Sequence, residues 1–380
     1  MTPTPIEHGT FESKAGYVGA ITLLTLTLTL AFSGHDNISF GFVVLTHETT
    51  LFSIILTTGI IMAAYDISTR TSWHRRHGIT WLAPDPRPIR ILTRSALIRF
   101  STTGLLIGAG WYIINHHYYF QSANFDFTKQ FYDYLAITYL IAGYPLHLVT
   151  LKKLGRRSYD LNDYALLTLL GIKGLWIWCA GIICRWPMAT ARGRKIVTSR
   201  RVRKTYLVHL VNFFFLTLMT SFFSNEYDAF SNSTTTAIHS VTSGNRLFEQ
   251  YHDIYLSLYH LIFVIDTGIA IVGYSTASRW LDNRTKSVDM TLYGWFVVLL
   301  CYPPMNTGFT DKFIGYGTPP TTQLITSEWA LMLLMPLILS CYLVYLWATL
   351  ALGFRFRNLT HRGLVASGPY RYIRHPAYTT

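Results

Sequence analysis

Charged residues are scarce in this chain. Only 13% of its 380 residues are Asp, Glu, Lys or Arg, whereas 50% are hydrophobic and 15% are aromatic. A soluble domain of this size needs a larger charged surface, so the composition argues against the soluble globular class. It predicts a polytopic membrane protein instead.

Cysteine is also scarce, and its placement excludes two kinds of stabilising chemistry. The four cysteines lie inside apolar stretches and form no CxxC pair: Cys179, Cys184, Cys301 and Cys341. They support neither a disulfide framework nor a cysteine metal site. The run Trp73-His-Arg-Arg-His77 has spaced histidines but no cysteine or acidic partner. No metal cofactor is therefore predicted.

The N-terminus lacks the basic start of a secretory signal, because its first fifteen residues hold one Lys and two Glu. The first apolar run is therefore predicted to remain as a membrane anchor. A bilayer-crossing helix needs about 20 apolar residues. Nine runs approach that length: 16–33, 50–67, 97–115, 131–150, 164–184, 205–224, 254–274, 289–306 and 329–353.

The linkers between these runs differ sharply in charge. Of the 32 Lys and Arg residues, 27 fall in five linkers: 68–99, 151–157, 185–204, 275–287 and 355–380. The alternate linkers hold only Lys129, Arg246 and Lys312 between them: 34–49, 116–130, 225–250 and 307–328. By the positive-inside rule the basic linkers and both termini are cytoplasmic, in a bacterial inner membrane or an endoplasmic reticulum-type membrane. This placement explains the net charge of +13 without a nucleic-acid partner.

The run 164–184 breaks this alternation, because basic linkers flank it on both sides. It contains Gly171, Lys173, Gly174 and Gly181, which favours a re-entrant or interfacial segment that returns to the cytoplasmic side. The predicted fold is thus all-α, with about eight transmembrane helices and one such segment. We expect a multi-span region of unknown role over 1–250 and a second membrane region over 251–380.

Polar residues inside the predicted spans form a first candidate site. Asp253, His260 and Thr267 follow at heptad spacing, with Asp266 nearby. Ionisable groups at such depth are expensive and often functional, so a proton or substrate path is one interpretation. Hydrogen bonding between packed helices is the favoured one, because no regular array of carboxylates continues across the other spans. Further polar residues in spans are His147, His209 and Asn212.

The last residues of the chain form a second and more specific candidate. Gly363 and the pair Gly368-Pro369 predict a bent backbone after the last apolar run. Two arginines, Arg371 and Arg374, suit a carboxylate, and the tyrosines offer flat faces for an adenine or a sulfonium cation. His375 precedes Pro376, which fixes an imidazole at a chain reversal or helix start. The alternative interpretation is a basic and aromatic segment that follows the last membrane helix and contacts lipid headgroups.

The order of residues 368–378, Gly-Pro-Tyr-Arg-Tyr-Ile-Arg-His-Pro-Ala-Tyr, closely resembles the cofactor motif of the isoprenylcysteine carboxyl methyltransferase and phospholipid methyltransferase group of integral membrane enzymes. The resemblance covers about 329–380 and implies an S-adenosylmethionine-dependent methyltransferase with a lipidic or lipid-attached acceptor that enters from the bilayer. It implies Arg374 and His375 as candidate catalytic residues. The implied cofactor pocket consists of Leu364, Val365, Gly368, Pro369, Tyr370, Arg374, His375, Pro376 and Tyr378.

In that group a second motif with Arg and paired Glu follows one or two further helices, so we expect either a continuation beyond Thr380 or completion of the site by another component. Two other functions stay open at this point. Sterol-reductase-like membrane proteins carry a related Arg-x-Pro-x-Tyr element but use NADPH. A non-enzymatic transporter or scaffold with a relic tail is the third. The sequence leaves the oligomeric state open.

Overall fold

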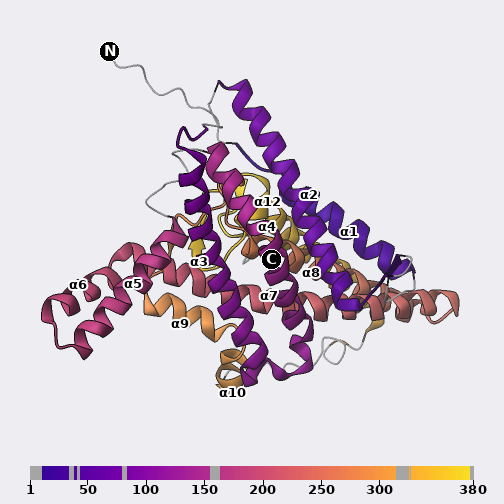
Figure 1. Ribbon diagram of the computed structural model, residues 1–380. Coiled ribbons are helices and arrows are strands. Elements are labelled where there is room, and N and C mark those ends of the chain that lie inside the picture. The colour runs from indigo at the N-terminus through magenta and orange to yellow at the C-terminus, as the bar shows by residue number, and fades with distance from the viewer. Residues whose placement is uncertain are drawn as a thin grey trace, which may run out of the picture. The chain divides into compact units, whose positions relative to one another are not determined.

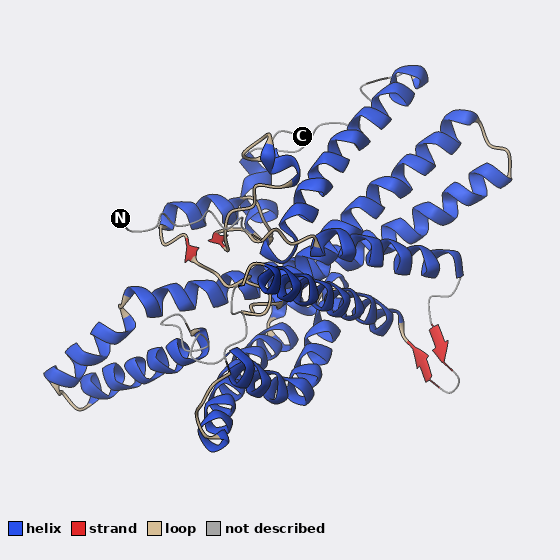
Figure 2. Ribbon diagram, turned by 90° about the horizontal axis from the view of Figure 1, so that it is seen from above, coloured by secondary structure: helices blue, strands red, loops and turns tan. Residues whose placement is uncertain are grey.

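The computed structural model describes residues 11–33, 38–40, 43–78, 84–154, 163–313, 325 and 327–376. The predicted all-α class is confirmed, since helices dominate the described chain (Figure 2). Its described strands form two short antiparallel pairs. β1 (Ile38–Phe40) pairs with β2 (Val43–Leu45), and β3 (Ser287–Val288) pairs with β4 (Thr360–His361).

Eight described helices are long and apolar enough to cross a membrane (Figure 1). This is typical of a multi-pass membrane protein. The eight are α1 (Ala15–Ser33), α2 (His47–Arg76), α3 (Ile89–His116), α4 (Asp126–Leu154), α5 (Tyr164–Ile183), α7 (Arg200–Thr242), α8 (Leu247–Ser275) and α12 (Glu328–Leu352). The shorter elements are α6 (Pro187–Val197), α9 (Leu292–Leu300), α10 (Asp311–Phe313), the π-turn η4 (Asn306–Thr310), and the 3-10 turns η1 (Tyr118–Gln121), η2 (Ala123–Phe125), η5 (Gly353–Arg355) and η6 (Gly368–Arg371).

The predicted span 289–306 is wrong as one continuous helix, because turns and the π-turn η4 follow the short helix α9. Its nine residues rise about 14 Å, less than half of a bilayer core of roughly 30 Å. Thr291 caps α9, and its backbone N–H and hydroxyl both donate to Asp289, which lowers the pKa of Asp289. At the other end, α9 stops at Leu300, shortly before Pro303 and Pro304, which cannot continue a helix.

The predicted linker 225–250 is also wrong for most of its length, because α7 continues as a helix to Thr242 and contains 43 residues. Contacts with α8 accompany this extension. The Thr234 and Ser257 hydroxyls are 2.7 Å apart, and the Ser240 hydroxyl donates to Asp253. These hydrogen bonds to α8 stabilise the Ser- and Thr-rich segment as a helix. A hydropathy profile does not detect them.

The run 164–184, predicted as re-entrant, forms α5, a 20-residue helix of spanning length. The chain then doubles back as α6, so that the two helices lie side by side (Figure 1). Their antiparallel contact depends on glycine, since a Cβ at Gly193 would lie 2.3 Å from the Trp178 backbone nitrogen. A Cβ at Gly181 would lie 2.5 Å from the Thr190 nitrogen. We call this pair the α5–α6 hairpin.

The chain divides into two compact units, with boundaries inside α2 and α7. Unit 1 comprises residues 1–13, 63–214 and 278–284, and unit 2 comprises 14–62, 215–277 and 285–380. The division into these two units reflects how compactly each part folds and says nothing of the role of either part. The predicted division by role at residue 250 stays a prediction.

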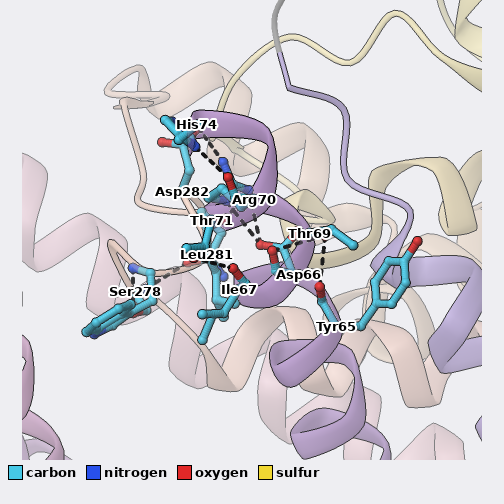
Figure 3. A network of polar contacts seen from close by, with 12 residues as sticks. Tyr65, Asp66, Ile67, Thr69, Arg70, Thr71, His74, Ser278, Leu281 and Asp282 are labelled. Atoms are coloured by element: carbon cyan, nitrogen blue, oxygen red, sulfur yellow. Dashed lines mark hydrogen bonds and ion pairs between the residues drawn. The ribbon is translucent and has the colours of Figure 1, made fainter. Parts of the chain in front are cut away.

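Unit 1 contains α3, α4 and the α5–α6 hairpin, and two arginine networks connect its parts. Arg99 of α3 binds Asp163 at 2.7 Å, just before α5. In the second network, Arg70 of α2 binds Asp66 one turn earlier at 3.1 Å and donates to the Leu281 carbonyl at 3.1 Å (Figure 3). The Asp66 and Arg70 side chains are both buried. Arg70 therefore ties segment 278–284 to α2.

Unit 2 is built on α1, α8 and α12, which pack against one another. α1 approaches α12 at backbone level, because a Cβ at Gly16 would lie 2.0 Å from the Leu350 carbonyl oxygen. α8 is the most buried of the three, with a continuous buried run from Val264 to Tyr274. The C-terminal segment that carries the predicted cofactor motif lies in this unit.

Candidate functional site

The C-terminal segment folds back at the end of α12. Gly353 ends the helix with a φ of +47°, a conformation that favours glycine. The chain then pairs as β4 with β3. The pairing is extended by hydrogen bonds from the Lys286 N–H to the His361 carbonyl (2.7 Å) and from the Asp289 N–H to the Leu359 carbonyl (2.9 Å). This pairing fixes the path of the chain into the motif.

Two arginines anchor the segment to the end of α8. Arg362 is only 2% exposed, and its guanidinium donates to the Thr276 carbonyl at 2.6 Å and to the Phe354 carbonyl. Arg357 donates to the Tyr274 and Thr276 carbonyls at 3.3 and 3.4 Å. Hydrogen bonds from a charged donor are stronger than neutral ones. These arginines therefore hold the backbone, and neither was predicted from the sequence as a structural anchor.

The turn η6 packs against α12 and begins at Gly368. Gly368 has a φ of +61°, and a Cβ there would lie 2.9 Å from Ala351 Cβ and 3.3 Å from Trp347 Nε1. Trp347 Nε1 in turn donates to the Tyr17 hydroxyl at 3.0 Å. The predicted bend at Gly368-Pro369 is thus confirmed, and both its backbone conformation and its close packing require glycine.

The predicted cofactor residues differ in exposure. Leu364 is 86% exposed, Arg374 and His375 are also exposed, and Val365, Gly368 and Tyr370 are half-buried. Pro369 and Pro376 are buried, and Tyr378 lies outside the described residues. Arg374 forms no ion pair with any carboxylate in the described part of the chain. An exposed guanidinium of this kind suits the carboxylate of a ligand.

Asp266 of α8 is a buried carboxylate in unit 2 that contacts α12, the helix against which η6 packs. It is 4% exposed and accepts hydrogen bonds from the Thr349 hydroxyl at 2.6 Å and the Tyr345 hydroxyl at 3.0 Å, both from α12. Asp266 thus connects α8 to the helix on which the motif folds.

The other polar residues predicted inside the spans have local partners, except Asn212, whose side-chain oxygen is buried without a hydrogen bond to any described residue. Asp253 accepts from Ser240, His260 binds Glu226 at 2.8 Å, and the Thr267 hydroxyl donates to the Phe263 carbonyl. His147 is paired with Tyr139, and His209 with Thr168. These contacts favour the helix-packing interpretation over a continuous path. Glu226 was not predicted, because its segment was assigned to a linker.

Within the described residues, no three His, Cys, Asp or Glu side chains are grouped as ligands for a metal ion. The comparisons with known proteins add no relative. The chain matches no protein family model, and neither the curated proteins nor the solved structures contain a significant match.

Proposed function

We propose that this chain is a membrane-embedded, S-adenosylmethionine-dependent methyltransferase that acts on a lipidic or lipid-attached acceptor. The proposal starts from the order of residues 368–378 and its resemblance to the isoprenylcysteine carboxyl and phospholipid methyltransferase group. S-adenosylmethionine brings an already activated methyl group, so the protein mainly has to bind, orient and exclude water.

The observation that supports this proposal best is the exposure of the Arg374 side chain. Its guanidinium is exposed and without a carboxylate partner among the described residues, while the neighbouring Pro369 and Pro376 are buried. A charged donor just after the turn η6 suits the carboxylate of an amino-acid-like ligand. Tyr370 and Tyr372 supply aromatic faces beside it. A carboxylate or thiolate acceptor needs little base assistance, and for an amine or hydroxyl acceptor the exposed His375 can take the proton.

Arg374→Ala and His375→Ala are each expected to weaken S-adenosylhomocysteine binding by about tenfold, which corresponds to roughly 1.4 kcal/mol. The measurement is isothermal titration calorimetry on the purified full-length gene product. Matched controls are Arg94→Ala, an exposed arginine of α3, and His361→Ala, an exposed histidine of β4. Unchanged affinity in both motif variants, or no binding by the unaltered protein, contradicts the proposal.

A reductase is the second candidate, because the Arg-x-Pro-x-Tyr element also occurs in sterol-reductase-like proteins. His375 and the Gly368-Pro369-Tyr370 lead-in favour the methyl donor. Thermal-shift measurements with NADPH and with S-adenosylmethionine separate the two, since a bound ligand raises the unfolding midpoint. A transporter or scaffold is favoured instead if deletion of 358–380 leaves the cellular function intact.

The proposal also requires the motif to face the cytosol, where such a donor is made. By the positive-inside rule the basic linkers favour a cytosolic position for both termini, and the turn of the α5–α6 hairpin between two basic segments is consistent with it. In a variant whose four native cysteines are serine, Ala366→Cys is expected to react with a membrane-impermeant thiol reagent only after the membrane is opened. Ser243→Cys, between α7 and α8, is expected to react without opening. The reverse pattern excludes the proposed orientation.

A further inference from the structure

A groove of about 730 Å³ runs along the α5–α6 hairpin. Its lining includes three cationic side chains, Arg185, Arg194 and Lys195, and two hydroxyl side chains, Thr190 and Thr198. The groove belongs wholly to unit 1. It has no part in the proposed methyl transfer, so the inference below does not depend on that proposal.

The spacing on α6 places these side chains together. Thr190, Arg194 and Thr198 recur every four residues, which puts them on one face of a helix. The face of α6 that packs on α5 includes Gly193, Ile196 and Thr190: a Cβ at Gly193 would meet Trp178, a Cβ at Gly174 would lie 2.5 Å from Ile196, and a Cβ at Gly181 would lie 2.7 Å from Thr190 Oγ1. Arg194 and Lys195 are exposed beside this contact. The hairpin contact therefore leaves the cationic face of α6 open to a ligand.

The chain supplies no counter-charge for this face. Residues 164–225 contain no Asp or Glu at all. In the described parts of the chain, neither Arg185, Arg194 nor Lys195 forms an ion pair with a carboxylate. Three cations that converge on one groove repel one another unless an anion lies between them. The anion must come from outside the hairpin.

The apolar residues at the hairpin tip indicate where that anion is found. Ile183 is 80% exposed and Met188 is 87% exposed, and Ile182 and Trp186 are also exposed. Large apolar side chains beside a cationic helix face are typical of a segment at the membrane interface, with the apolar groups among acyl chains and the cations at headgroup level. The groove then lies at the depth of the lipid phosphates.

We propose that the groove of the α5–α6 hairpin binds the phosphate of an anionic phospholipid. Arginine matches phosphate oxygens with paired N–H donors, and lysine adds a point charge. The hydroxyls of Thr190 and Thr198 donate to the Trp186 and Arg194 carbonyls, so the three cations supply the donors. A lipid occupies the site better than free phosphate does, because its acyl chains cover the exposed Ile182, Ile183 and Met188.

Native mass spectrometry of the purified full-length protein in a neutral detergent tests this site, with dioleoylphosphatidylglycerol as the probe and dioleoylphosphatidylcholine as the zwitterionic comparison. The unaltered protein is expected to retain the anionic lipid at concentrations where the zwitterionic lipid is lost. The triple variant Arg185→Gln, Arg194→Gln and Lys195→Gln is expected to bind phosphatidylglycerol at least about tenfold more weakly.

A matched control removes the same charge elsewhere on the same segment. Lys173→Gln, Arg192→Gln and Arg200→Gln change three exposed cations that do not line the groove, and this variant is expected to bind the lipid like the unaltered protein. Equal losses in the two variants, or equal retention of the two lipids by the unaltered protein, overturn the proposal. So does competition by millimolar inorganic phosphate that displaces the lipid fully, which would indicate a site for the free anion. The two-lipid comparison needs no variant, so a misfolded triple variant does not leave the question open.

Discussion

Arg362→Met is expected to detach the C-terminal segment from α8 and to destabilise unit 2 by about 2–5 kcal/mol. The substitution keeps an apolar stem of similar length but removes the donors to the Thr276 and Phe354 carbonyls. A buried carbonyl that loses its donor costs roughly 1–3 kcal/mol. Hydrogen exchange should report the change directly, through lost protection of the Lys286 and Asp289 amides that pair with β4.

Arg355→Met is the matched control for this prediction. Arg355 lies in the same segment and is only half-buried, and its guanidinium donates to the Leu364 carbonyl at 2.9 Å. Water can replace a donor at an exposed carbonyl, so the expected loss is below about 1 kcal/mol. Equal losses of amide protection in the two variants would show that burial of Arg362 has no special role.

Asp266→Leu is expected to lower the free energy of unfolding by about 3 kcal/mol, because it leaves the Thr349 and Tyr345 hydroxyls without their acceptor in a buried place. The leucine side chain has the branched shape of aspartate and introduces no charge, but it is larger, so overpacking of the buried site adds to the lost hydrogen bonds. The measurement is the unfolding midpoint of the detergent-solubilised protein.

A rescue experiment distinguishes this explanation from simple misfit. Thr349→Val and Tyr345→Phe remove the two orphaned hydroxyls, and replacing all partners by apolar groups of similar shape is nearly neutral. The triple variant should therefore unfold closer to the unaltered protein than Asp266→Leu alone. If the added substitutions lower the midpoint further, the contacts of Asp266 are not what holds α8 against α12.

Hydropathy predicted most of the spans because a bilayer requires a minimum apolar length. It failed where other contacts decide the length of a helix. The apolar run of α7 ends at residue 224. The helix continues because Glu226, Thr234 and Ser240 form hydrogen bonds with side chains of α8. At 289–306 the composition was apolar enough, but a capped start at Thr291 and the prolines at 303–304 leave only the short helix α9, which turns follow.

The candidate site was predictable to a similar degree. Glycine and proline report backbone geometry locally, so the bend at Gly368-Pro369 could be read from the sequence. The roles of Arg357 and Arg362 could not, because they depend on carbonyls more than 70 residues away in the chain. The sequence singled out Asp266 as an ionisable residue within a span. It did not identify the hydroxyl partners of Asp266 on α12, because these are also distant in the chain.

The length of α7 has a consequence for the surroundings of the protein. Its 43 residues extend about 65 Å, roughly twice the thickness of the hydrocarbon layer. A helix of this length that crosses a bilayer extends beyond it, and the polar segment after residue 224, with Asn225, Glu226, Asp228 and Asn232, has the composition of a part outside the lipid. The contacts of Thr234 and Ser240 join this segment to α8, so the two helices extend together beyond the apolar run of α7.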